Sequence, residues 1–278
     1  MILDGRALAK DILVQVKARA AALGRAPRIA ALVTSETSAT KSYLGIKEKR
    51  AADAGCTLEI MRFPEDVSTG ALAAAVRAAY ADAVIVQLPL PENVAATDVC
   101  DAIPLSKDAD VLSRAARAAF ENAEGALLPP VVGAVRKILE FGNVNVAGKR
   151  AAVIGAGFLV GAPVAAWLKR QGALVEVVTK ESGDLSAALH AADIIVSGAG
   201  APHLITPAML SDGAVLIDAG TSESGGAIVG DADPACAERC SLFTPVPGGV
   251  GPVAVACLFE NAVALAYRRR EAEKTTNI

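Results

Sequence analysis

Apolar and polar residues follow two different periods along the first half of the chain. Short apolar runs, typical of buried strands, are separated by longer stretches with apolar residues at helical spacing. The predicted strands are residues 28–34, 56–63 and 83–88. The predicted helices are residues 8–23, 38–54 and 68–80, with Gly55 after the second and Ser68 capping the third. Strands that alternate with helices in this way predict βαβ units and a parallel sheet.

The second half repeats this alternation after a polar stretch. Residues 92–125 show no clear period and predict an irregular segment, whereas the pair Pro129-Pro130 starts a predicted helix that runs to Phe141. A turn-rich linker follows at 142–148. Further strands are predicted at 149–154, 173–179, 193–197 and 214–218, and further helices at 159–170 and 253–267. The last ten residues are charged, and we expect them to fray.

Two glycine-rich segments interrupt this pattern. Gly155-Ala156-Gly157-Phe-Leu-Val160-Gly161 lies between a predicted strand and a predicted helix, where glycines let the backbone approach a pyrophosphate. Its spacing is GxGxxxG rather than GxGxxG, so the motif alone is weak. The second segment, residues 244–252, holds three glycines and three prolines directly before a predicted helix. Together they suggest a nucleotide site and the wall of a second ligand site.

The pattern predicts an α/β chain of two domains, which suits its 278 residues. We expect an N-terminal α/β catalytic domain in residues 1–125 and a Rossmann-type dinucleotide-binding domain in residues 126–251. The C-terminal helix, in residues 252–278, is expected to return to the first domain and complete it.

Composition narrows the class of protein. Apolar residues make up 53% of the chain and aromatic residues only 4%, so the core is built from small aliphatic side chains, as in a parallel sheet covered by helices. The net charge of −3 argues against a nucleic-acid partner. We find no apolar run of the roughly 18 residues that would span a membrane, and no secretion signal at the N-terminus. These features predict a cytoplasmic protein without a membrane partner.

The residues that bind metals in other proteins are scattered here. The five cysteines stand at positions 56, 100, 236, 240 and 257, and only Cys236 and Cys240 are close in sequence. Neither His190 nor His203 has a cysteine or carboxylate cluster nearby, and we therefore predict no metal site.

Four polar residues are candidates for chemistry. Tyr43 and Lys47 lie four residues apart on one predicted helix and share a face, although this spacing also suits a surface lysine that covers a half-buried tyrosine. Gln87 ends an apolar strand, and ligands of open α/β sheets bind at such strand ends. Asp110, in the segment Lys107-Asp-Ala-Asp110, resembles a loop carboxylate by itself.

Several motifs, in the same order and over almost the whole length, resemble the bifunctional methylenetetrahydrofolate dehydrogenase/methenyltetrahydrofolate cyclohydrolase family. The two most specific are Val86-Gln-Leu-Pro-Leu-Pro91 and Thr244-Pro-Val-Pro-Gly-Gly-Val-Gly-Pro252. The others are Ser42-Tyr-Leu-Gly-Ile-Lys47, Lys107-Asp-Ala-Asp110, Val160-Gly-Ala-Pro163 and Gly230-Asp231.

The resemblance implies oxidation of 5,10-methylenetetrahydrofolate by a nicotinamide cofactor, followed by hydrolysis of the methenyl product to 10-formyltetrahydrofolate. It implies that Lys47 directs proton transfer in the hydrolysis, that Gln87 tunes Lys47, and that Tyr43 stacks on the folate. Asp110 is implied to accept hydrogen bonds from the pterin. The remaining residues implied to line the folate site are Leu88, Pro89, Gly249, Val250, Gly251 and Pro252. A homodimer is also implied.

The departures from the family pattern lie mainly on the cofactor side. The family usually carries Arg-Ser where this chain has Ala156-Gly157, and Gly where it has Val111. The residues expected to bind the cofactor are Gly155, Ala156, Gly157, Val160, Gly161, Thr179, Lys180 and Gly198. Lys180 could pair with the 2′-phosphate of NADP, whereas Glu181 could accept from the free 2′-hydroxyl of NAD. We favour NADP and keep NAD as the alternative.

Three other functions fit the same residues less well. The first is a variant that works mainly as the cyclohydrolase, and the second is a dehydrogenase for another pterin carrier of one-carbon groups. The third is a regulatory folate-binding protein whose cofactor site has decayed; the altered Ala156-Gly157 pair permits it, and the retained Lys47 argues against it.

Overall fold

A computed structural model describes residues 1–34, 38–122 and 127–276, with the side chains of 38–44 and 276 outside that description. The chain forms two compact units. The five-stranded unit comprises Met1–Ala9 and Val131–Ala254, and the three-stranded unit comprises Lys10–Pro130 and Val255–Ile278.

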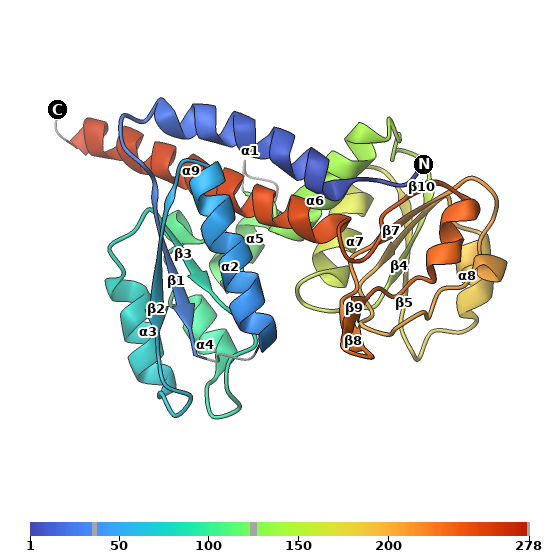
Figure 1. Ribbon diagram of the computed structural model, residues 1–278, viewed down its shortest axis with the longest axis horizontal. Coiled ribbons are helices and arrows are strands. Elements are labelled where there is room, and N and C mark those ends of the chain that lie inside the picture. Colours follow the sequence, from blue (N-terminus) through green and yellow to red (C-terminus); the bar gives the residue numbers. More distant parts are fainter. Residues whose placement is uncertain (35–37, 123–126, 277–278) are drawn as a thin grey trace. The chain divides into compact units, whose positions relative to one another are not determined.

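The three-stranded unit is built on a parallel sheet in the order β2-β1-β3. Its strands are β1 (Arg28–Val33), β2 (Thr57–Arg62) and β3 (Ala83–Val86). Helices α2 (Ser38–Asp53) and α3 (Thr69–Ala78) connect these strands, as Figure 1 shows. All of β3 and nearly all of β1 are buried, because a parallel sheet with crossover helices has two apolar faces. The strands and helices predicted for this half are confirmed.

Most of two long helices lies in this unit. Residues 10–21 of α1 (Gly5–Ala21) and residues 255–276 of α9 (Val250–Thr276) run side by side here (Figure 1). The hydroxyl of Tyr267 on α9 donates to the carbonyl of Arg19 at 2.7 Å, and Arg270 donates to the carbonyl of Ala22 at 3.2 Å. The prediction that the C-terminal helix returns to the first domain is therefore confirmed.

Two local predictions for this unit are wrong. The stretch 92–125 is not irregular throughout, because it contains α4 (Ala96–Asp101), a 3₁₀ turn (Leu105–Lys107) and α5 (Arg114–Glu121). The hydroxyl of Ser113 caps α5 by accepting from the amide of Ala116 at 3.2 Å.

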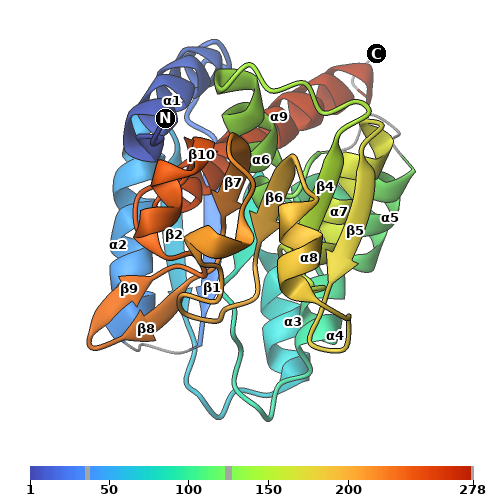
Figure 2. The same ribbon diagram turned by 90° about the vertical axis from the view of Figure 1, so that its right-hand side faces the viewer.

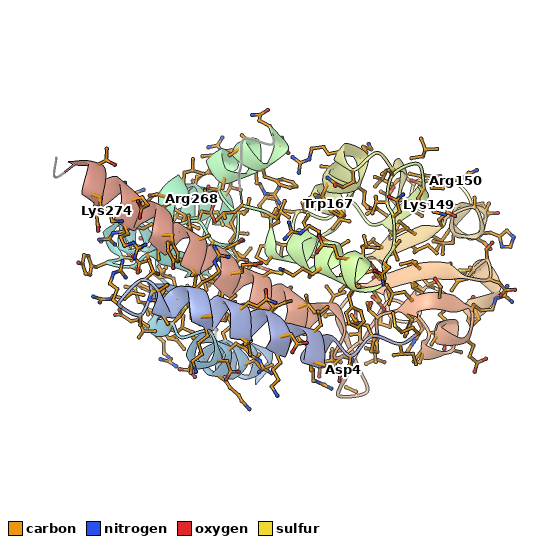
Figure 3. All side chains as sticks on the ribbon, turned by 90° about the horizontal axis from the view of Figure 1, so that it is seen from above. Asp4, Lys149, Arg150, Trp167, Arg268 and Lys274 are labelled. Carbon is orange, nitrogen blue, oxygen red and sulfur yellow. The ribbon has the colours of Figure 1, made fainter. Side chains whose placement is uncertain are left out.

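The last turns of α9 are helical to Thr276 rather than frayed. Arg269 pairs with Glu273 at 2.8 Å, and Lys274 pairs with Glu271 at 2.9 Å, spacings that favour a helix. Figure 3 labels Arg268 and Lys274 on this segment.

By its length and hydropathy alone, α9 could cross a membrane. A window within Val250–Thr275 has a mean hydropathy of 1.6, but 67% of it is buried inside the protein. Its apolar residues, among them the fully buried Phe259, therefore serve the protein core, as in central helices of globular proteins.

The five-stranded unit holds a parallel sheet in the order β10-β7-β6-β4-β5, which Figure 2 faces. The strands are β4 (Arg150–Ile154), β5 (Leu174–Val178), β6 (Ile194–Ser197), β7 (Ala214–Asp218) and β10 (Cys240–Phe243). The accompanying helices are α6 (Pro130–Phe141), α7 (Gly161–Arg170) and α8 (Leu185–His190). A small antiparallel hairpin, β8 (Ser222–Ser224) with β9 (Ala227–Val229), follows β7.

The order of these strands positions a ligand site. From β4 the chain passes to β5 on one side and then to β6 on the other, so the direction of winding reverses between β4 and β6. Ligands of open α/β sheets bind beside the carboxyl ends of strands at such a reversal. The loops after β4 and β6, which contain Gly155 and Gly198, meet there.

Candidate active site

Lys47 is a buried amine with one defined partner. It lies on α2 with 8% of its surface exposed, and its Nζ donates to Oε1 of Gln87 at 2.8 Å. Gln87 directly follows β3, and its own Nε2 donates to the carbonyl of Leu88 at 2.9 Å. This second hydrogen bond turns the amide oxygen of Gln87 toward the amine. The structure therefore brings these two predicted residues together.

Asp110 is electrostatically coupled to this amine. Burial lowers the pKa of Lys47, and the nearby charge of Asp110 partly opposes that shift. Burial likewise raises the pKa of the half-buried Asp110; Lys47 opposes this change and Asp108 reinforces it. A buried amine with a lowered pKa can give and take a proton at neutral pH, which suits a general acid or base.

The loop that carries Asp110 is fixed by two residues that sequence reasoning missed. Asp108, 1% exposed, accepts from the amide of Ser113 at 2.8 Å and from its hydroxyl at 2.7 Å. Asn261 on α9 donates from Nδ2 to the carbonyls of Ala109 and Leu128, both at 2.9 Å. A buried asparagine in an otherwise apolar helix needs such partners, and this was the signal available in the sequence.

Val111 has a strained backbone directly after Asp110. Its φ is +56°, in the left-handed region that β-branched residues rarely adopt, and its side chain is only 2% exposed. The position thus favours glycine, the residue that the family usually carries there, and nothing in the structure explains the valine. Strain of this kind is often found beside functional residues.

The other folate-side candidates are placed as follows. Tyr43 belongs to α2, one turn before Lys47, and its side chain lies outside the described residues. Leu88 packs against the core of the three-stranded unit, and Pro89 is exposed after a cis peptide bond. Gly249 directly precedes α9 and residues 250–252 begin it, and all four belong to the five-stranded unit.

The predicted glycine turn of the five-stranded unit has the geometry of a phosphate cradle. Gly155 has a φ of +88°, and a side chain on Gly161 would overlap the carbonyl of Gly155. A side chain on Gly198 would collide with Val160, whereas the space around Gly157 is open. The backbone can therefore approach a ligand at the N-terminus of α7, where the helix dipole favours an anion. These residues fit a dinucleotide.

The helix after the glycine turn begins later than the sequence predicts. The predicted helix at 159–170 begins only at Gly161, and Phe158 to Val160 form a turn. This leaves Phe158 and Leu159 each 47% exposed.

Two buried carboxylates order the neighbouring loops. Asp231 accepts from the hydroxyl of Ser197 at 2.7 Å and from the amides of Ala199 and Ala201, both at 2.8 Å. Asp218, at the end of β7, accepts from the amides of Gly220 and Ala232. Burial, reinforced by the charge of Asp231, raises the pKa of Asp218 to about 6. Both side chains therefore stabilise the loops that follow β6 and β7.

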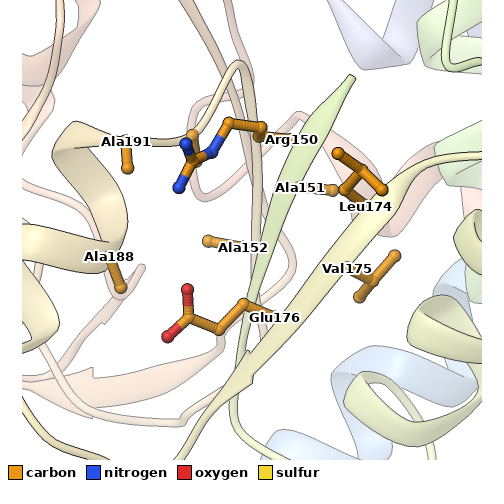
Figure 4. A pocket seen from close by; sticks show the side chains of 9 residues that line it. Arg150, Ala151, Ala152, Leu174, Val175, Glu176, Ala188 and Ala191 are labelled. Atoms are coloured by element: carbon orange, nitrogen blue, oxygen red, sulfur yellow. The ribbon is translucent and has the colours of Figure 1, made fainter. Parts of the chain in front are cut away.

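A depression of about 390 Å³ lies elsewhere in this unit. It is lined by Arg150, Glu176 and several small apolar side chains of β4, β5 and α8 (Figure 4). Arg150 and Leu174 begin their strands, so the depression opens toward the amino ends, away from the glycine turn. It is therefore distinct from the expected ligand site. Across the part of the chain that the structure describes, no group of three metal-binding side chains occurs.

Comparison with known proteins identifies both units. Residues 3–110 match the tetrahydrofolate dehydrogenase/cyclohydrolase catalytic domain, and residues 129–270 match the NAD(P)-binding domain of the same family.

Full-length relatives and solved structures agree with these matches. The bifunctional protein FolD of Heliobacterium modesticaldum is 36% identical, with 94% of each chain covered, and that of Hydrogenobaculum sp. is 34% identical, covering 97% of this chain and 99% of the relative. The FolD crystal structure from Campylobacter jejuni superposes with a TM-score of 0.93 at 31% identity, covering 97% of this chain and 99% of the other. The Trypanosoma brucei enzyme, solved with NADP and an inhibitor, gives 0.91 at 32% identity, covering 97% and 98%.

Proposed function

The chain belongs to the tetrahydrofolate dehydrogenase/cyclohydrolase family, and on that premise we propose that it oxidises 5,10-methylenetetrahydrofolate and hydrolyses the product to 10-formyltetrahydrofolate. The observation that carries this proposal is the buried amine of Lys47, hydrogen-bonded to Gln87 and coupled to Asp110. All three belong to the unit that matches the catalytic domain.

In the hydrolysis, water adds to the bridging methenyl carbon and gives up one proton. The remaining hydroxyl proton is transferred to N5 as the bond from this carbon to N5 breaks and the carbonyl of the formyl group forms. The formyl group remains on N10. Neutral Lys47 accepts the proton of the attacking water, and the protonated amine is then stabilised by the amide oxygen of Gln87. Burial lowers the pKa of Lys47 and so favours the neutral form that accepts this proton.

Asp110 and the remaining folate-side residues position the substrate. A carboxylate that faces the amino edge of a pterin makes charge-assisted hydrogen bonds, and Asp108 and Asn261 hold the loop that presents Asp110. We assign stacking on the folate to Tyr43, and the remaining lining to Leu88, Pro89 and residues 249–252.

For the oxidation we propose that the glycine turn and the loop after β5 hold a nicotinamide dinucleotide. The residues concerned are Gly155, Ala156, Gly157, Val160, Gly161, Thr179, Lys180 and Gly198. When bound, the nicotinamide accepts a hydride from the one-carbon bridge, and the protein contributes mainly alignment of the two partners. Of the neighbouring residues, Lys180 favours NADP and Glu181 favours NAD.

Three further assignments belong to this proposal. Residues 1–125, completed by 252–278, form the folate domain, and residues 126–251 form the dinucleotide domain. The protein is a homodimer, which light scattering after gel filtration tests directly. We assign the protein to the cytoplasm.

Replacement of Lys47 by methionine tests the hydrolytic role. General acid–base groups contribute about 10²- to 10⁴-fold, so we expect K47M to hydrolyse methenyltetrahydrofolate at least ~100-fold more slowly. Folate affinity, measured by equilibrium binding, should stay within a few-fold of wild type.

The matched control is K49M, which removes an exposed lysine of the same helix and should leave the rate unchanged. Hydrolysis by K47M at the wild-type rate would remove Lys47 from the mechanism and with it the main support for the proposed function.

A further inference from the structure

The loop after β5 lies directly beside the glycine turn. Ile154 and Val178 are paired in neighbouring parallel strands, and the amide of Gly155 donates to the carbonyl of Val178 at 2.8 Å. Residues 179–182 therefore emerge at the same edge of the sheet as the phosphate cradle. In Rossmann-type domains the adenosine ribose lies at this edge, and an acidic residue near it binds the ribose hydroxyls.

The hydrogen bonds of this loop hold the carboxylate of Glu181 in place. The hydroxyl of Thr179 donates to Oε2 of Glu181 at 2.7 Å. Ser182 closes the turn, because its Oγ accepts from the amide of Thr179 at 2.9 Å and its amide donates to the carbonyl of Thr179 at 3.1 Å. The bond from Thr179 also holds the pKa of Glu181 below its usual range, so the exposed carboxylate is ionised at neutral pH.

The charges around this loop do not favour a 2′-phosphate. Ala156 and Gly157 provide no cation at the turn, and the neighbouring charge of Lys180 is offset by Glu181, whose pKa it helps to lower. A phosphate with a charge near −2 would meet a fixed carboxylate. A ribose hydroxyl, in contrast, can donate to that carboxylate, which has room for more than the one hydrogen bond from Thr179.

We propose that Glu181, anchored by Thr179, accepts a hydrogen bond from the adenosine 2′-hydroxyl and makes this chain prefer NAD to NADP. This inference rests on the proposed dehydrogenase function and concerns the same dinucleotide site. It assigns to Glu181 a selective role that works in two ways, by attraction of the hydroxyl and by repulsion of the phosphate.

Calorimetric titration of the full chain with NAD⁺ and NADP⁺, without folate, tests the proposal. Since a like charge at the ribose costs affinity, we expect wild type to bind NAD⁺ at least about tenfold more tightly than NADP⁺. In E181Q the amide oxygen can still accept from Thr179, and the preference should fall to within about threefold as NADP⁺ gains affinity. The matched control is E176Q, which removes an equal charge from the exposed face of β5 and should keep the wild-type preference.

A third ligand isolates the hydrogen bond from the repulsion. An NAD⁺ analogue without the adenosine 2′-hydroxyl should bind wild type about tenfold more weakly than NAD⁺. In E181Q, the difference in affinity between the analogue and NAD⁺ should be smaller. If removal of the 2′-hydroxyl weakened binding equally in wild type and in E181Q, the carboxylate of Glu181 would not be the acceptor of this hydrogen bond.

Two other results would also overturn the proposal, and they are distinguishable. Tighter binding of NADP⁺ to wild type, lost in K180A, would assign the site to Lys180 and leave the dehydrogenase function standing. Binding of neither dinucleotide would remove the dinucleotide site itself, while the hydrolysis that depends on Lys47 would be judged separately.

Discussion

At the scale of single residues, the proposed chemistry depends on where a lysine is placed. An exposed lysine is fully charged at neutral pH, whereas Lys47 is 8% exposed and its pKa is lowered. Its partner Gln87 is neutral, so the amine has an acceptor without a fixed ion pair that would keep it protonated. Burial and a neutral acceptor together suit the amine to the proton transfer that we propose for it.

Replacement of Gln87 by methionine tests this arrangement. Because a hydrogen bond to the charged amine favours that form, its loss should lower the pKa of Lys47 further. The rising limb of the pH profile for methenyl hydrolysis should therefore move to lower pH, and the plateau rate should fall about 10- to 100-fold. In the double variant with K47M, Q87M should have no further effect, and additive losses would show that the two residues act independently.

Spacing along the sequence was not sufficient to find this site. Tyr43 and Lys47 at four-residue spacing are equally typical of a surface lysine over a tyrosine, and only the family resemblance favoured catalysis. The hydrogen-bond partner of Lys47 is Gln87, 40 residues away, which no local pattern reveals. For Glu181 the reverse holds, because Thr179 and Ser182 lie within three residues and their turn is a local feature.

At the scale of elements, long periodic segments were predictable and short ones were not. The helix 38–54 is long and the strand 83–88 is an almost unbroken apolar run, and the structure places α2 and β3 there. Helices α4 and α8 have six residues each, too few to display a helical period, and the apolar run of β10 is interrupted by Ser241. Such elements are set by caps and by neighbouring strands, as the cap of Asp184 on α8 illustrates.

One element controls the loop of Asp110 from a distance. Asn261 on α9 supplies hydrogen bonds to the carbonyls of Ala109 and Leu128, so N261L should leave two buried carbonyls without a donor. We expect a loss of about 1–3 kcal/mol in the free energy of unfolding and a several-fold higher KM for methylenetetrahydrofolate. Urea denaturation and steady-state kinetics measure these two effects.

The matched control for this variant is N93L. Asn93 also donates to a carbonyl of the same unit, that of Val67 at 3.1 Å, but it is exposed and belongs to a different loop. It should change stability less and leave the KM unaltered. An equal KM effect in both variants would show that Asn261 has no particular role in positioning Asp110.

At the scale of the whole molecule, the alternating pattern predicted a two-domain α/β protein, and the family and structure comparisons confirm it. The pattern of apolar and polar residues did not predict the order of the strands within each sheet. The place of β10 beside β7, for example, depends on the pairing of Phe243 with Leu216, 27 residues earlier in the chain. Likewise, the apolar length of α9 does not distinguish a membrane span from a core helix until its burial is known.

The pH dependence of stability in the five-stranded unit follows from Asp218. Its pKa in the folded protein, about 6, lies above the ordinary value of 3.8, so the folded state binds the proton more readily than the unfolded state. Stability should therefore rise as the pH falls through 6, by about 1 kcal/mol between pH 8 and pH 5.5. Urea unfolding followed by the fluorescence of Trp167, the single tryptophan, reports on this unit.

Replacement of Asp218 by asparagine separates this residue from the other titrating groups. Both carboxylate oxygens of Asp218 accept from backbone amides, so the NH₂ group of D218N would face an N–H donor and the variant should be less stable at both pH values. The variant should also lose the gain of about 1 kcal/mol on acidification, because it has no proton to bind. The exposed Asp212 provides the control, since D212N should keep the wild-type pH dependence. If D218N and wild type gained the same stability between pH 8 and 5.5, Asp218 could not be the group that titrates.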